Sequence, residues 1–284
     1  MKEINNIAVL GAGQMGHGIT QVAAMAGFEV HLTDISEDSL NRGLSKINKS
    51  VEKLVAKGKV EPEAMEVILG RVKTTTRLEE ALDGAEAVIE AATENAEMKF
   101  DIFKKVDKLA HPDALLLSNT SSVSITHIAG QTGRPERVMG MHFMNPVPLM
   151  RLVELIRGLV TAEETFQETE VLAHRMGKET VSSEDYPGFI VNRILVPMIN
   201  EACYALMERV ADVEDIDQAL RLGANHPMGP LQLADLIGLD TCLSIMEILH
   251  SDMGDAKYRP CPLLQRYVRA GFLGRKSGRG FYHY

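Results

Sequence analysis

Cysteine is scarce in this chain of 284 residues. The three cysteines, Cys203, Cys242 and Cys261, are odd in number, and none of them stands in a C-x-x-C spacing. Both facts argue against a disulfide framework and against a zinc cluster. We therefore expect no metal centre, and we expect a reducing compartment, the cytoplasm.

Long hydrophobic runs are also missing. No apolar segment reaches the length that is needed to span a membrane. The first strand-like residues begin at Ile4, so we expect neither a signal peptide nor a transit peptide. Fixed-period repeats and low-complexity tracts are absent as well, which excludes solenoid and linker proteins.

Basic residues are outnumbered by acidic ones, 30 to 39, and the formal net charge is -9. This balance argues against broad nucleic-acid binding, although a local basic patch can still hold a phosphate-bearing ligand. The length exceeds what one compact core usually holds, so two domains are expected.

Short apolar runs alternate with longer helical patterns over the first two thirds of the chain, which is typical of a parallel sheet covered by helices. We expect strands at residues 7–10, 29–34, 72–75, 87–91, 115–118, 138–143, 152–156 and 179–183. We expect helices at residues 15–26, 36–56, 95–110, 125–130 and 162–176. The order predicts an α/β fold with a Rossmann-type, doubly wound and mainly parallel sheet.

Strand-like sequence patterns almost vanish after Tyr186-Pro187-Gly188. The later patterns predict helices at residues 189–209, with a kink at Pro197, and at 213–222, 231–249 and 263–270. We therefore predict a nucleotide-binding domain over residues 1–186 and an all-α C-terminal domain over residues 187–284.

A glycine motif follows the first predicted strand. Its residues are Gly11, Ala12, Gly13, Gln14, Met15 and Gly16, and Asp34 closes the second strand 18 positions later. The glycines allow a tight turn and close approach of a diphosphate to a helix N-terminus, and Asp34 suits a ribose hydroxyl. No Arg or Lys follows Asp34 until Arg42, which favours NAD over NADP. An FAD or nucleotide-sugar site on the same fold is the alternative.

A histidine and a glutamate stand on the two arms of a proline-rich turn. His142 ends one apolar run, Glu154 interrupts the next, and Asn145-Pro146 and Pro148 lie between them. A buried carboxylate needs a partner, and a carboxylate that orients an imidazole is a common way to build a base that works near neutral pH. Taken by itself, this segment also allows an alternative, in which a core histidine has its hydrogen bonds satisfied for structural reasons and the glutamate lies on an edge strand.

The second predicted helix carries a line of lysines. Lys46, Lys49, Lys53 and Lys57 are separated by three, four and four residues, which places them along one side of the helix. They could hold the phosphates of a large anionic ligand, with the hydroxyl of Ser50 as a further contact. A solvated helix face is the alternative.

Together these motifs resemble the NAD-dependent 3-hydroxyacyl-CoA dehydrogenase family, and the similarity spans nearly the whole chain. The matching segments are the glycine motif with Asp34 and residues 94–99, 118–122, 142–154, 187–193, 226–231 and 274–282. Seven ordered matches are more specific than any single motif. The resemblance implies an oxidoreductase that interconverts (S)-3-hydroxybutyryl-CoA and acetoacetyl-CoA with NAD, and a homodimer formed through the C-terminal domain.

The resemblance also implies residue roles. It makes His142 the catalytic base and Glu154 its orienting carboxylate, and it makes Ser121 and Asn192 contacts to substrate near the reacting carbon. NAD contacts are implied for Glu94, Lys99, Ser121, Asn145 and Lys276, and CoA contacts for Ser50 and Lys57. Since Ser121 ends a strand of the first domain and Asn192 begins the second, we expect the substrate to bind between the domains.

Three rival functions follow from the same residues. A β-hydroxyacid dehydrogenase with a lysine base is disfavoured, because the segment from Gly188 to Asn200 contains no lysine. A sugar-acid dehydrogenase of the gulonate type could share the histidine, glutamate and asparagine. Its substrate has no CoA phosphates, however, so the line of lysines on the second predicted helix argues against it. A non-enzymatic NAD-binding protein would not need His142, Glu154, Ser121 and Asn192 together.

Overall fold

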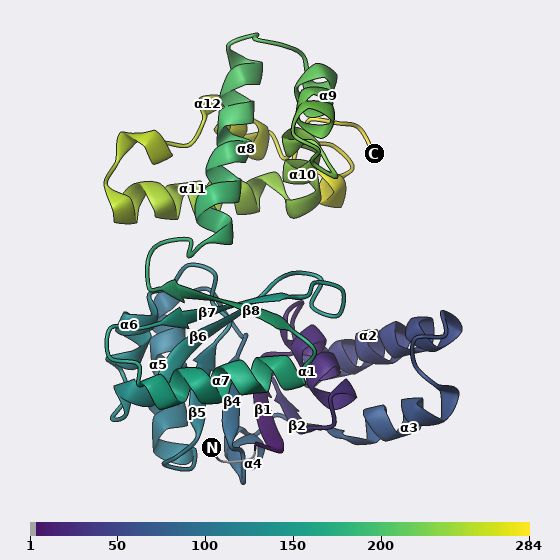
Figure 1. Ribbon diagram of the computed structural model, residues 1–284, viewed down its shortest axis with the longest axis vertical. Coiled ribbons are helices and arrows are strands. Elements are labelled where there is room, and N and C mark those ends of the chain that lie inside the picture. Colours follow the sequence, from purple (N-terminus) through teal and green to yellow (C-terminus); the bar gives the residue numbers. More distant parts are fainter. Residues whose placement is uncertain (1–3) are drawn as a thin grey trace. The chain divides into compact units, whose positions relative to one another are not determined.

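The computed structural model describes residues 4–284, and the chain divides into two compact units between Tyr186 and Pro187. The N-terminal unit holds one sheet of eight strands with the order β3-β2-β1-β4-β5-β6-β7-β8 (Figure 1). These strands are β1 (Asn6–Leu10), β2 (Glu29–Thr33), β3 (Val72–Thr75), β4 (Ala87–Glu90), β5 (Leu115–Ser118), β6 (Val138–Phe143), β7 (Leu152–Arg157) and β8 (Glu179–Glu184). The predicted doubly wound sheet is confirmed.

The strand order reverses beside β1, because β2 lies on one side of it and β4 on the other. Every pairing in the sheet is parallel except that of β6 with β7, which form an antiparallel pair. Parallel strands aligned in this way bring all their carboxyl ends to one edge, and the reversal at β1 opens a crevice there. This edge is where the glycine motif, Ser121 and Asn145 emerge.

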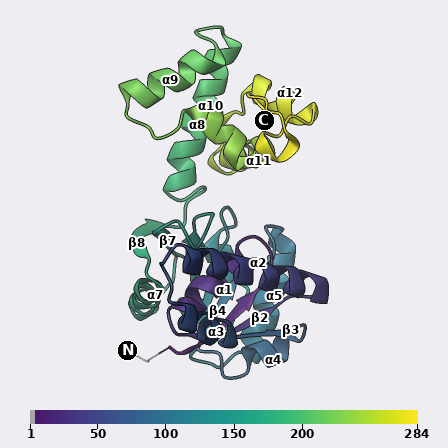
Figure 2. The same cartoon turned by 90° about the vertical axis from the view of Figure 1, so that its right-hand side faces the viewer.

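Helices cover both faces of the sheet. They are α1 (Gly16–Met25), α2 (Glu37–Ala56), α3 (Pro62–Gly70), α4 (Leu78–Leu82), α5 (Ala96–Leu109), α6 (Ile125–Ala129) and α7 (Glu163–Arg175). Apolar residues of α1 and α7 share one core with the strands, while α7 and α5 lie on opposite sides of the sheet (Figure 2). Connections between parallel strands of one sheet are almost always right-handed. Because the chain proceeds outward from β1 in both directions along the sheet, right-handed connections place helices on opposite faces.

Two short helices of the N-terminal unit, α3 and α4, are absent from the sequence-based prediction. Helix α3 begins at Pro62, a residue suited to the first turn, but its nine residues carry one buried side chain, Ile68. Helix α4 has five residues, of which Ala81 and Leu82 are buried. Segments this short show too little apolar periodicity to be recognised in sequence.

The C-terminal unit is helical, as expected. Its main helices are α8 (Val191–Met207), α9 (Val213–Gly223), α10 (Pro230–Ile237), α11 (Leu239–Met253) and α12 (Pro262–Arg269). The single helix predicted over residues 231–249 is wrong, because Gly238 has a φ of 105° and separates α10 from α11. A left-handed residue cannot continue an α-helix, and glycine adopts that conformation without steric cost. All three cysteines are free thiols buried in this unit.

Candidate active site

His142 and Glu154 are direct partners across the antiparallel pair of β6 and β7. Nδ1 of His142 lies 2.7 Å from Oε2 of Glu154, so the imidazole donates and the carboxylate accepts. The glutamate is fully buried and the histidine is 7% exposed. Strand β7 is flanked by β8, so Glu154 does not lie on an edge strand. A buried carboxylate at this position holds the orientation of the ring.

The glycine motif forms a tight loop between β1 and α1. The N–H of Gly11 donates to the carbonyl of Thr33 at 2.7 Å, and Gly11 has a φ of 98°. A Cβ on Gly16 would stand 1.7 Å from the carbonyl oxygen of Gly11, so no larger residue fits there. No heavy atom lies within 4 Å of the place where a Cβ on Gly13 would stand. The open space at Gly13, before the N-terminus of α1, fits a diphosphate.

Asp34 follows β2 and is tied to the glycine loop. Its Oδ2 accepts the N–H of Ala12 at 2.9 Å, and its Oδ1 accepts the N–H of Ser36 at 3.1 Å. The carboxylate is therefore held at the end of β2 with acceptor capacity left over, since each carboxylate oxygen takes more than one hydrogen bond. This geometry fits the ribose hydroxyls of NAD and places a negative charge where NADP would bring a phosphate.

Glu94 and Ser121 lie together at the ends of β4 and β5. Oε1 of Glu94 accepts the N–H of Ser121 at 2.8 Å and its hydroxyl at 3.0 Å, while Oε2 accepts the hydroxyl of Thr120 at 2.7 Å. The hydroxyl of Thr120 in turn accepts the N–H groups of Ser122 and Val123. Glu94 thus holds the loop on which Ser121 is presented.

Lys99 is buried beneath this loop. Its ammonium forms an ion pair with Glu90, and the hydroxyl of Ser118 donates to the same carboxylate at 2.9 Å. Both side chains of the ion pair are 1% exposed. Lys99 is therefore held by a buried ion pair at the base of the site, and its expected contact with the cofactor stays a prediction.

Asn145 is exposed on the loop between β6 and β7. That loop is held from below by Lys178, whose ammonium donates to the carbonyls of Val147 at 2.6 Å and Met150 at 2.9 Å. Burial lowers the pKa of Lys178 from its ordinary value. At the start of the loop, Asn119 accepts the N–H of Phe143 at 2.9 Å and so links the end of β5 to the end of β6.

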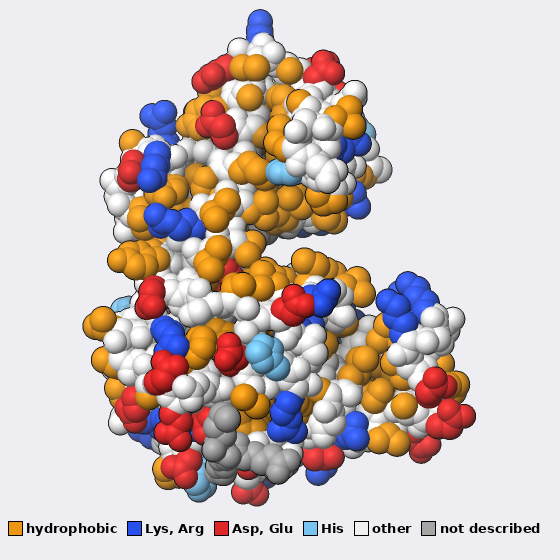
Figure 3. Space-filling view, viewed as in Figure 1, with side chains coloured by type: hydrophobic (Ala, Val, Ile, Leu, Met, Phe, Trp, Pro, Cys, Tyr) orange, Lys and Arg blue, Asp and Glu red, His pale blue; other side chains and the backbone are white. Residues whose placement is uncertain are grey.

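The remaining predicted residues lie on α2 and in the helical unit. Lys46, Lys49 and Lys53 are exposed on α2 and Lys57 is exposed at its C-terminal cap, where Figure 3 shows basic side chains gathered, and Ser50 is half-buried. Asn192 is half-buried in the first turn of α8. Lys276 is half-exposed in the helical unit and donates to Asp240 at 2.6 Å.

Four supporting residues, Glu90, Asn119, Thr120 and Lys178, were not predicted from the sequence. The polar run Ser118-Asn119-Thr120 after an apolar strand is a usable signal, because such a run marks the carboxyl edge of the sheet. Lys178 offers no comparable signal. Its partners lie some 30 residues away, and only the packing of the loop on β8 brings them together.

Comparison with known proteins shows the family to which the two units belong. The model of the 3-hydroxyacyl-CoA dehydrogenase NAD-binding domain matches residues 6–186, and the model of the C-terminal domain of the same family matches residues 188–284. The chain belongs to the 3-hydroxyacyl-CoA dehydrogenase family. This confirms the predicted family and the predicted NAD cofactor.

Relatives within this family are similar over their whole length. A probable 3-hydroxybutyryl-CoA dehydrogenase of Bacillus subtilis is 55% identical, covering 99% of this chain and 98% of the relative. The 3-hydroxybutyryl-CoA dehydrogenase of Bradyrhizobium diazoefficiens is 54% identical over 99% of this chain and 96% of its own. The crystal structure of (S)-3-hydroxybutyryl-CoA dehydrogenase from Ralstonia eutropha superposes with a TM-score of 0.96 at 46% identity, covering 99% of each chain.

Proposed function

We propose that this dehydrogenase interconverts (S)-3-hydroxybutyryl-CoA and acetoacetyl-CoA in the cytoplasm, with NAD as the hydride carrier. The observation that carries the proposal is the buried hydrogen bond from His142 to Glu154, in the unit that also holds the glycine loop. A base of defined orientation is what removal of a hydroxyl proton requires. The relatives named above are 3-hydroxybutyryl-CoA dehydrogenases, which supports the same choice here.

The proton transfer follows from the His142–Glu154 geometry. Because Glu154 accepts the proton on Nδ1, Nε2 is the ring nitrogen whose protonation changes during turnover. In oxidation, neutral His142 takes the proton of the 3-hydroxyl group. In reduction, the imidazolium returns a proton to the ketone oxygen. Bound NAD supplies the acceptor or donor for the hydride at the same carbon.

Glu154 keeps the imidazole oriented in both directions, since its carboxylate accepts the hydrogen bond from Nδ1. We assign Ser121 and Asn192 to contacts with the substrate near the reacting carbon, and Ser50 and Lys57 to the CoA moiety. The hydrogen bonds from Ser121 to Glu94 support this role, because they hold the serine loop in one conformation.

The cofactor contacts that we assign are the glycine loop, Asp34, Glu94, Ser121, Asn145 and Lys276. The fit of the loop supports the first of these, because Gly13 leaves open space and Gly16 packs against Gly11. Lys99 acts beneath the site through its ion pair with Glu90.

The test is a substrate series followed by the absorbance of NADH. We expect NADH to be consumed with acetoacetyl-CoA, and NADPH to be a poor substitute because Asp34 repels the 2′-phosphate. Gulonate with NAD serves as the rival substrate. Turnover of gulonate without turnover of any short-chain 3-ketoacyl-CoA would contradict the proposal.

A further inference from the structure

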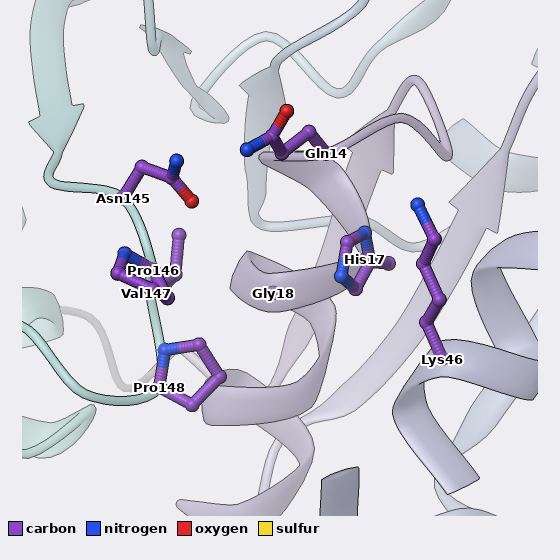
Figure 4. A pocket seen from close by; sticks show the side chains of 8 residues that line it. All are labelled: Gln14, His17, Gly18, Lys46, Asn145, Pro146, Val147 and Pro148. Carbon is purple, nitrogen blue, oxygen red and sulfur yellow. The ribbon is translucent and has the colours of Figure 1, made fainter. Parts of the chain in front are cut away.

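A pocket of about 250 Å³ lies in the N-terminal unit beside the glycine loop. Three elements line it: the beginning of α1, the middle of α2, and the loop between β6 and β7. Figure 4 shows Gln14 and Asn145 facing one another on one side and His17 beside Lys46 on the other. The proposed function assigns no role to His17, and it assigns none to Lys46 beyond its place in the line of lysines on α2.

The polar groups of this pocket favour an anion. Lys46 is exposed, and no described residue forms an ion pair with it. The imidazole of His17 donates through Nδ1 to the carbonyl of Gly13 at 2.6 Å, which orients the ring. Burial, and then the nearby charge of Lys46, lower the pKa of His17 against the opposing effect of that hydrogen bond. No carboxylate is among the residues that line the pocket.

Lys46 also belongs to the basic face of α2. Lys46, Ser50, Lys53 and Lys57 repeat at intervals of four, three and four residues, while the opposite face is buried through Gly43, Ile47 and Val51. From Lys46 to Lys57, the residue that follows the last turn of α2, the face covers eleven steps of the chain, or roughly 16 Å along the helix axis. Gly43 packs against Ala12 and His17, so Lys46 is the lysine of this face that lies nearest the glycine loop.

One wall of the pocket belongs to the segment that carries the proposed base. This wall is formed by Asn145, Pro146, Val147 and Pro148. These residues follow β6 after Met144, and His142 is the last residue of β6 but one. A ligand that lies along the lysines of α2 and fills the pocket therefore contacts the loop that follows His142.

We propose that Lys46, oriented toward the pocket beside His17, binds the diphosphate of the coenzyme A moiety. The inference rests on the proposed function. Ser50 and Lys57 then hold the 3′-phosphoadenosine end, and the pantetheine arm passes Asn145 toward His142. The diphosphate of NAD has a separate site, because the backbone N–H groups at Gly13 and at the N-terminus of α1 attract it.

The experiment compares two thioesters of the same acid in the intact enzyme. Acetoacetyl-CoA carries the phosphates, whereas S-acetoacetyl-N-acetylcysteamine has the same reacting group without them. For Lys46→Met we expect the ratio of kcat/KM for acetoacetyl-CoA to that for the short thioester to fall about tenfold, the size of one lost charged hydrogen bond. Lys46→Arg keeps the charge and should restore most of the ratio.

Lys105→Met is the matched control, because Lys105 is an exposed lysine on α5, away from the pocket. It should leave the ratio unchanged. An unchanged ratio in Lys46→Met would overturn the inference, and so would a rise in the KM for NADH with both thioesters, which would assign the pocket to the cofactor. If the wild-type enzyme turned over neither thioester, the proposed function itself would fail, so the two failures are distinguishable.

Discussion

The pairing of His142 with Glu154 depends on register. The two residues are twelve positions apart, and they become direct neighbours because β6 and β7 pair antiparallel with His142 opposite Glu154. A shift of β7 by one residue against β6 would turn Glu154 to the face of the sheet opposite His142. The sequence predicted the two residues and the turn between them, but the distance of 2.7 Å follows from the register alone.

Replacing Glu154 by glutamine tests this pair. Glu154→Gln should lower kcat by roughly a hundredfold or more, the usual contribution of an oriented base. The Kd for NADH, measured by fluorescence titration, should stay close to that of the wild type, because three strands of the sheet separate β7, which carries Glu154, from β1 and the glycine loop that follows it.

A control for burial is available in the same unit. Glu168 is buried and forms an ion pair with Arg137 at 3.0 Å. Glu168→Gln should lower the melting temperature while kcat stays near the wild-type value. If Glu154→Gln lost NADH binding and turnover to the same extent, Glu154 would have a structural role instead.

At the scale of elements, the ends of β4 and β5 are joined by one hydrogen-bonded network. It runs from the ion pair of Lys99 with Glu90 through Ser118 and Thr120 to Glu94, which holds Ser121. Helix and strand positions were predictable here, because apolar periodicity and caps such as Asn95 act locally. The network was not predictable, because its members come from segments up to 28 residues apart.

Thr120→Val removes the hydroxyl at the centre of this network with little change in volume. We expect kcat/KM for acetoacetyl-CoA to fall about tenfold to a hundredfold, since small misplacement of a contact residue has effects of this size. Thr120→Ser keeps the hydroxyl and should retain most of the activity. Equal losses in the two variants, measured by steady-state kinetics, would show that the hydroxyl does not position Ser121.

At the scale of the whole molecule, each unit has its own hydrophobic core. The helical unit also exposes large apolar side chains, among them Ile194 at 66%, Val210 at 72% and Leu222 at 77%. No helix among residues 4–284 has both the length and the apolar character that crossing a bilayer would need. Large exposed apolar side chains of this kind are candidates for a protein interface.

We expect a homodimer formed through the helical unit. Analytical ultracentrifugation should give a mass twice that of the 31.2 kDa chain. Ile194→Lys should shift the species toward the monomer, because it places a charge on the exposed face of α8. Val181→Lys, on the exposed edge strand β8, is the control and should remain dimeric. A monomeric wild-type protein at micromolar concentration would contradict this expectation.

Local sequence was enough to predict the strands, the longer helices of the first domain and the glycine loop with Asp34, because each depends on residues close together in the chain. The family followed from the order of seven such local motifs along the chain. The hydrogen bond of His142 to Glu154, the ion pair of Lys99 with Glu90 and the support of the Asn145 loop by Lys178 depend on strand register and packing. The tertiary structure therefore decided which of the recognised polar residues face the site and which support it from below. The physical reason is that buried polar groups need partners, and only the folded chain determines which partners are within reach.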